Sequence, residues 1–158
     1  MFAIACDTQT HNPDVSNGVS LFLLPDIEGN DREVRTVAGG RTVLAFWATW
    51  CTPCRRELVE LDSLYADFAR RGLAIYAVSV DDATTVDDVG PWVAEAGYRF
   101  PVVLDTDHGI LARYQPARQI PFVVVLDEDG RVVEQWQGYG RGEIDALRER
   151  LDQILAPD

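Results

Sequence analysis

Two apolar stretches separated by one amphipathic segment place the strongest constraint on how this chain can fold. Residues 42–48 form a continuous apolar run of strand length, which is typical of a strand covered on both faces. Leucine and aromatic residues then recur at three- and four-residue spacing from Leu58 to Phe68, and this helical pattern ends at Gly72. Residues 73–80 are a second apolar run. Together these segments predict a β-α-β unit with parallel strands and a right-handed crossover.

The rest of the chain adds short strands and helices around this unit. The patterns predict an N-terminal β-hairpin over residues 19–24 and 33–37, and a helix that starts at residue 88 or 91 and ends at residue 96. A strand over residues 100–104 and a short helix over residues 108–114 follow. Two paired strands over residues 122–126 and 132–137 come next, and a C-terminal helix includes residues 147–155. This order indicates an α/β fold, with a mixed central sheet flanked by helices on both faces and an N-terminal β-hairpin extension. We expect one domain over residues 18–158, after a flexible polar tail over residues 1–17.

The charge of the chain argues against one large class of partner. Twenty-six acidic residues against fourteen basic ones give a net charge of −12. A surface of this sign repels phosphate backbones, so we expect no nucleic acid partner. The apolar residues come in short blocks, which does not favour a membrane span, and three cysteines are too few for a scaffold built on disulfides.

Two of the three cysteines, Cys51 and Cys54, lie where the first predicted strand leads into the helix. A sulfur at this junction is close to unpaired backbone N–H groups and to the positive end of the helix dipole, which favours the thiolate of Cys51. Cys54 lies one turn later, where it can attack a mixed disulfide formed by Cys51. Pro53 is tolerated in the first helical turn, and Trp50 would give the site a flat apolar wall.

Zinc and a structural disulfide are the other interpretations of such a pair. A structural zinc site needs two more ligands, and only Cys6, His11 and His108 are available, at no recognisable spacing. A bridge across one turn closes so small a loop that it constrains little. We therefore expect a reactive pair with no metal, whose redox group is the Cys51–Cys54 disulfide itself and which needs no separate cofactor.

Residues 43–58, 100–107 and 120–130 resemble the TlpA/ResA-like branch of the thioredoxin superfamily. The resemblance implies a thioredoxin fold, a thiol–disulfide oxidoreductase activity and an active site shaped by Trp50, Thr52 and Pro53. It also implies a cis bond at Ile120-Pro121 that helps the substrate chain to dock, although the family usually has Thr where this chain has Phe122.

Two neighbouring acids are candidates to assist proton transfer. Thioredoxin itself carries an Asp in its central strand where this chain has Ala45, which makes a general thioredoxin less expected. TlpA/ResA-like proteins instead tend to place an acid just after the second strand, where Asp81 and Asp82 stand. These two residues could equally be solvated loop residues that cap the next helix.

The resemblance further implies an extracytoplasmic, periplasmic disulfide reductase, either for cytochrome c maturation or for general protein disulfides. Its partners would be disulfide-containing proteins and a membrane or soluble thiol electron donor, and we favour a monomer. Ala3-Ile4-Ala5-Cys6 is similar to the end of a bacterial lipoprotein cleavage site, so the chain could be membrane-anchored through its N-terminus. If Met1 is the true start, we expect a cytoplasmic protein with an incidental Cys6.

Two other functions on the same fold stay open at this point. A thiol peroxidase would need Thr three residues before the nucleophile, where this chain has Ala48. The domain could also be a non-catalytic protein-binding module or a copper carrier. Copper chaperones of related fold favour a wider cysteine spacing and a well-placed His, and neither is evident.

Overall fold

The computed structural model describes residues 12–157, and its central strand is β3 (Arg41–Trp47). β3 pairs in parallel with β4 (Leu73–Ser79) and antiparallel with β6 (Phe122–Leu126). β5 (Val102–Leu104) and β7 (Val132–Gln137) complete a five-stranded mixed sheet in the order β5-β4-β3-β6-β7. β3 is buried from Thr42 to Trp47 because strands flank both of its edges and side chains cover both of its faces. This confirms the predicted central strand and the parallel β-α-β unit.

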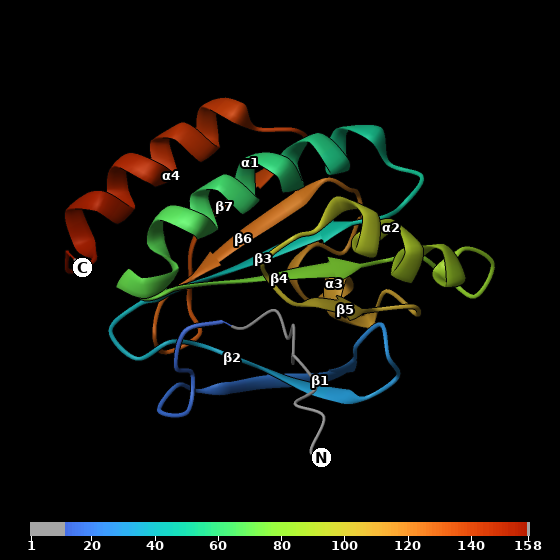
Figure 1. The fold of residues 1–158 in the computed structure, drawn as a ribbon, viewed down its shortest axis with the longest axis horizontal. Coiled ribbons are helices and arrows are strands. Elements are labelled where there is room, and N and C mark those ends of the chain that lie inside the picture. The colour runs from blue at the N-terminus through green and yellow to red at the C-terminus, as the bar shows by residue number, and fades with distance from the viewer. Residues whose placement is uncertain (1–11, 158) are drawn as a thin grey trace, which may run out of the picture.

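Helices cover both faces of the sheet, as predicted. α1 (Thr52–Phe68) and α4 (Arg141–Ile154) run side by side over one face (Figure 1), and Arg148 of α4 pairs with Asp67 of α1. Arg71, in the short 3-10 helix that follows α1 (Ala69–Arg71), pairs with Asp152 of α4. Successive side chains of a strand point to opposite faces. The ring of Trp47 therefore contacts Tyr98, which follows α2 (Val89–Ala96), whereas Phe46 contacts Tyr114 at the end of α3 (Gly109–Tyr114) on the other face.

The predicted N-terminal hairpin is present as β1 (Ser20–Pro25) and β2 (Asp31–Arg35). It lies below the face of the sheet opposite α1 and α4 (Figure 1), and an isolated bridge between Asp26 and Val103 joins it to β5. The hydroxyl of Thr36 donates to the carbonyl of Glu128 at 2.7 Å, which ties the hairpin to the turn between β6 and β7. The hairpin thus belongs to the same folded unit as the sheet.

The predicted tail, residues 1–17, lies partly outside the described residues, which start at Asn12. Asn12 itself is buried, and its side-chain oxygen accepts from the backbone N–H of Ile75 at 3.0 Å. None of the helices within residues 12–157 combines the length and the apolar character that crossing a membrane requires. The apolar residues instead form one core around the sheet.

Candidate active site

The cysteine pair lies at the junction of β3 and α1, where the sequence pattern places it. Cys51 is the N-cap of α1, and its sulfur accepts from the backbone N–H of Cys54 at 3.3 Å. The two sulfur atoms form a disulfide, with the Cα atoms 5.3 Å apart. Cys51 is 7% exposed and Cys54 only 1%, so an incoming sulfur reaches Cys51 more readily. A helix start around a sulfur that accepts a backbone N–H bond also stabilises a thiolate there.

The residues around the pair present a surface to solvent. Thr52 and Pro53 are exposed at the first two positions of α1, where the missing N–H of Pro53 leaves no helical acceptor unpaired. Trp50 is 61% exposed, so its indole lies on the surface and not in the core. The positions between and before the cysteines are therefore available for contact with another chain.

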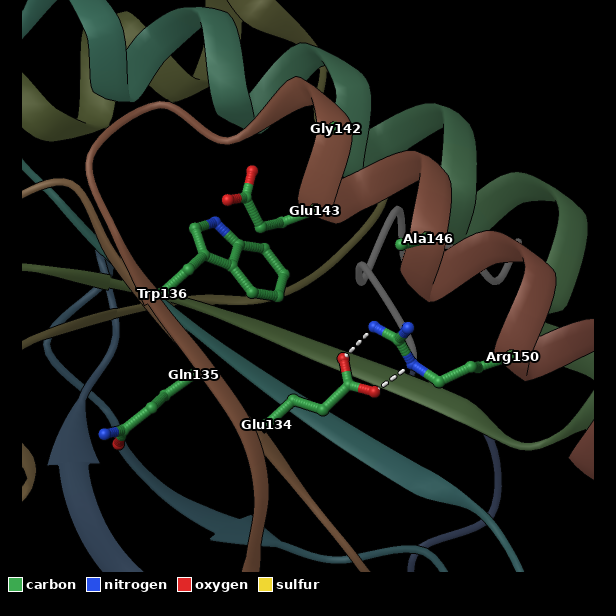
Figure 2. Close-up of a pocket in the computed structure, with 7 residues that line it drawn as sticks. All are labelled: Glu134, Gln135, Trp136, Gly142, Glu143, Ala146 and Arg150. Atoms are coloured by element: carbon green, nitrogen blue, oxygen red, sulfur yellow. Dashed lines mark hydrogen bonds and ion pairs between the residues drawn. The ribbon is translucent and has the colours of Figure 1, made fainter.

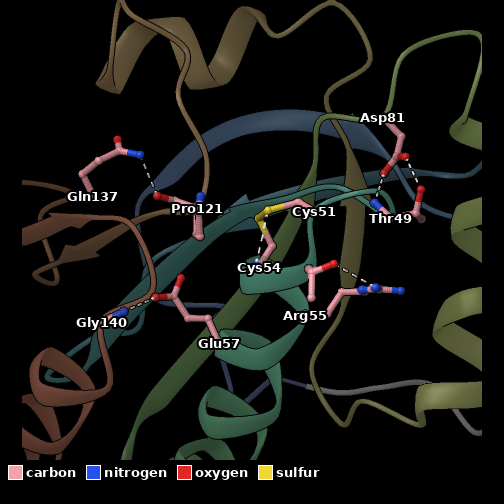
Figure 3. Close-up of a disulfide and its surroundings, with 10 residues drawn as sticks. Thr49, Cys51, Cys54, Arg55, Glu57, Asp81, Pro121, Gln137 and Gly140 are labelled. Atoms are coloured by element: carbon pink, nitrogen blue, oxygen red, sulfur yellow. Dashed lines mark hydrogen bonds between the residues drawn. A yellow bond between two sulfur atoms is a disulfide. The ribbon is translucent and has the colours of Figure 1, made fainter.

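Pro121 lies beside the disulfide at the start of β6 (Figure 3), and the Ile120-Pro121 bond is cis, as the resemblance implies. Phe122 pairs with Phe46, so the next step along both strands brings Pro121 to the end of β3 from which the cysteine loop leaves. The carbonyl of Pro121 accepts two hydrogen bonds from the end of β7. The backbone N–H of Gly138 donates at 2.8 Å, and the side-chain amide of Gln137 donates at 3.0 Å.

The structure places the two predicted acids in different surroundings. Asp81 is fully buried and accepts from the backbone N–H and the hydroxyl of Thr49 at 3.0 and 2.6 Å, and from the hydroxyl of Ser79 at 2.7 Å (Figure 3). It therefore holds the turn that leads into Trp50 and Cys51. Asp82 is exposed and accepts from the backbone and hydroxyl of Thr84, and these bonds lower the pKa of its carboxyl.

A third acid, Glu57, belongs to the site and was not singled out from the sequence. It lies three residues after Cys54 on the same face of α1, and its side chain is buried at 2% exposure. One of its oxygens, Oε2, accepts from the indole N–H of Trp136 and from the backbone N–H of Gly140, both at 3.1 Å. Burial raises the pKa of Glu57 above its ordinary value of 4.5, although these two bonds act in the opposite direction.

The sequence did contain a signal for Glu57. Cys54, Glu57, Leu58 and Leu61 follow the inward face of the helix at three- and four-residue spacing, whereas Val59 falls outside that face. The structure agrees with this spacing: the apolar side chain of Val59 is 62% exposed, whereas the acidic side chain of Glu57 is buried. A charged residue inside an apolar stripe is the pattern that would have identified it.

Trp136, which donates to Glu57, also lines a surface groove between β7 and α4 (Figure 2). The groove is lined by Trp136, by the ion pair of Glu134 with Arg150, and by Glu143. Neither cysteine lines this groove, so it is distinct from the redox site. Within residues 12–157, no group of three or more His, Cys, Asp or Glu side chains is arranged to hold a metal ion.

Known proteins resemble this chain over most of its length. The model of the AhpC/TSA family matches residues 15–135. The thiol-disulfide oxidoreductase ResA of Bacillus thuringiensis (strain Al Hakam) is 33% identical over 134 residues, which cover 85% of this chain and 72% of the relative.

Two solved structures are also similar. One is assigned as the thiol:disulfide interchange protein DsbE of Chlorobium tepidum, with 27% identity, a TM-score of 0.71 and coverage of 88% of this chain and 97% of that chain. The other is StoA of Bacillus subtilis, with 28% identity, a TM-score of 0.65 and coverage of 84% and 97%.

Proposed function

The chain belongs to the AhpC/TSA family of thioredoxin-like proteins and is a thiol–disulfide oxidoreductase, and from this premise we propose that it reduces protein disulfides outside the cytoplasm. Disulfide-containing proteins are its substrates. The observation that carries the proposal is the position of Cys51, whose sulfur caps α1 and which is more exposed than Cys54.

In the proposed reaction the reduced protein starts with a Cys51 thiolate. This sulfur attacks one sulfur of the substrate disulfide, so that a mixed disulfide forms and the substrate S–S bond breaks. The electron pair leaves on the second substrate sulfur, which takes up a proton. Cys51 performs this step because the first turn of α1 stabilises its thiolate form.

Cys54 completes the reaction. Its deprotonated sulfur attacks Cys51 Sγ, the mixed disulfide breaks, and the remaining substrate sulfur departs as a thiol. Two electrons have then passed to the substrate, and the protein is left with the Cys51–Cys54 disulfide. Because Cys54 is only 1% exposed, it meets Cys51 more readily than any outside disulfide.

We assign the surface around the pair to substrate docking, and the buried acids to positioning the turn before Cys51 and to proton exchange. Trp50, Thr52, Pro53, Ile120 and Pro121 would receive the substrate chain, since Trp50 is exposed and Pro121 lies beside the disulfide (Figure 3). Asp81 would position the turn before Cys51 through Thr49. Glu57, whose pKa is raised by burial, would exchange a proton with Cys54 on the same helix face.

The electron donor would be a second dithiol, from a membrane or a soluble protein, which becomes a disulfide as it reduces Cys51–Cys54. We place this cycle in an extracytoplasmic compartment because structural disulfides persist in oxidising surroundings and are rare in the cytosol. The segment Ala3-Ile4-Ala5-Cys6, which is similar to a lipoprotein cleavage site, supports an anchor at the N-terminus.

Insulin reduction in the presence of dithiothreitol tests the reductase activity. The wild type should accelerate the precipitation of insulin, and Cys51→Ser should react no faster than dithiothreitol alone. Cys6→Ser is the matched control, because it removes a thiol outside the pair and should keep the full rate. Equal rates for the wild type and Cys51→Ser would overturn the proposed activity.

The direction of the reaction is tested by the reduction potential of the pair in thiol–disulfide buffers. A reductase should lie below about −200 mV, whereas a value near about −120 mV would identify an oxidant. Consumption of hydrogen peroxide by the reduced protein, dependent on Cys51 and faster than insulin reduction, would instead identify a peroxidase.

A further inference from the structure

Arginine supplies all fourteen basic residues of this acidic chain, and the structure divides these arginines into two groups. Half of them form ion pairs with carboxylates, namely Arg32, Arg35, Arg71, Arg99, Arg131, Arg148 and Arg150. The other seven form no such ion pair among the described residues, and three of them, Arg55, Arg56 and Arg118, flank the two segments that meet at the disulfide. We call these three residues the basic rim.

Arg55 and Arg56 lie at the start of α1, immediately after Cys54. Cations are disfavoured at the positive end of a helix, and this first turn contains no acidic residue that would offset them. Arg55 is nevertheless held in place, because its guanidinium stacks over Trp92 at 4.3 Å and donates to the hydroxyl of Thr52, between the two cysteines, at 3.3 Å (Figure 3). The positive charge is thus fixed at the mouth of the site against the preference of the helix.

Arg118 lies on the loop that carries the cis proline. Its φ of 54° is in the left-handed region, which a side chain other than glycine or asparagine occupies at a cost in free energy. The turn is held by the backbone N–H of Arg118, which donates to the carbonyl of Gln115 at 3.0 Å, and by the side chain of Gln115, which accepts from Gln119. Three residues span at most about 10 Å, so the exposed Arg118 side chain can reach a chain docked along Pro121.

We propose that the basic rim, together with the exposed Trp50, docks a protein segment that carries Asp or Glu side chains next to its disulfide. The inference rests on the proposed function, since it names the class of substrate that this same site prefers. Acidic side chains would pair with the arginines of α1 and with Arg118 of the cis-proline loop, while an apolar residue of the segment covers Trp50.

The net charge of −12 does not oppose this local preference at physiological salt. Exposed charges are largely screened beyond about 8 Å, so a docked segment senses the rim and not the whole surface. Of the two acids on the loop after β4, Asp81 is buried against Thr49, whereas Asp82 is exposed and keeps its negative charge while it accepts from Thr84. The charged side chains in the first turn of α1 and in residues 115–121 are nevertheless all arginines, and the next acid along α1, Glu57, is buried.

The test uses two peptides of equal length that contain the same internal disulfide and differ only in having Asp or Lys on both sides of it. The rate at which each peptide oxidises the reduced full-length protein is followed by quenching and chromatography. The wild type should prefer the Asp peptide by about five- to tenfold, as expected for a few exposed charge pairs. In about 1 M NaCl, where screening acts within about 3 Å, the preference should disappear.

Two double variants with the same change in net charge provide the comparison. Arg56→Glu with Arg118→Glu should abolish or reverse the preference. Arg70→Glu with Arg131→Glu changes two exposed arginines, one just past the C-terminal end of α1 and one at the end of the β6–β7 turn, and it should keep the preference of the wild type.

Each outcome separates this inference from the proposed function. If the wild type reduces insulin and both peptides at equal rates, the docking inference is overturned and the reductase stands. If oxidised glutathione reacts as fast as the Asp peptide, the rim recognises small anions and the inference of a protein segment is also overturned. If Cys51 supports no exchange with insulin or with either peptide, the proposed function itself fails.

Discussion

Glu57→Gln is expected to gain stability relative to the wild type over a pH range that starts near 4.5, the ordinary pKa of a glutamic acid, and extends upward. Both bonds to Glu57 end on a single oxygen, so the carbonyl oxygen of glutamine can accept from Trp136 and Gly140 in the same way. The substitution therefore removes the ionisation of the group and keeps its hydrogen bonds. At the acidic end of the range the two proteins should differ by no more than about 1 kcal/mol.

The sign follows from the pKa of Glu57, which burial raises above 4.5 in the folded state. Between its unfolded and folded pKa values the folded protein binds more protons than the unfolded one, so stability is lost as the pH rises through that window. The loss amounts to about 1.4 kcal/mol for each unit by which the pKa is raised, and the glutamine variant does not suffer it.

Urea unfolding of the oxidised proteins, followed by tryptophan fluorescence across this pH range, measures the difference. Glu60→Gln, a partly exposed position on the same helix, is the control and should differ from the wild type by less than about 0.5 kcal/mol at every pH. Parallel stability curves for Glu57→Gln and the wild type would refute the argument, because they would mean that the folded protein carries the buried charge at no cost.

Three further substitutions test the packing around the site by the same urea measurement. Asp81→Ala should destabilise the protein by about 3 kcal/mol or more, since it leaves three donors without their acceptor, and a loss below about 1 kcal/mol would contradict this. Val59→Glu should change stability by less than about 0.5 kcal/mol, whereas Leu61→Ala on the inward face should cost about 2–5 kcal/mol; similar losses would show that the helix faces are assigned wrongly. Gly140→Ala should cost about 1–3 kcal/mol because its Cβ would lie 2.8 Å from Cδ1 of Trp136. An unchanged stability would show that Trp136, near the end of β7, can move aside to make room for the Cβ.

Most of the fold could be predicted because it depends on local patterns. The apolar run of β3, the helical spacing of α1 and the second run of β4 lie within forty residues of one another, and each matches the period of its own element. Gly72 follows the final turn after α1, and Gly97 follows α2. Their φ values of 105° and 67° favour glycine. The boundary of the domain at residue 18 and the roles of Trp50, Thr52 and Pro53 in docking stay predictions.

The sequence by itself determined the reactive pair, because a strand followed directly by a helix places Cys51 at the helix start and Cys54 one turn later. Only the tertiary structure decided which acidic and basic side chains around that pair are buried and which are exposed. Glu57 is buried because its acceptor oxygen meets donors 79 and 83 residues later in the chain, and Asp81 is buried because it meets Thr49, 32 residues earlier. Periodicity tells which side chains share a face, but a polar group can be buried only where distant segments supply its partners, and those segments meet only in the folded chain.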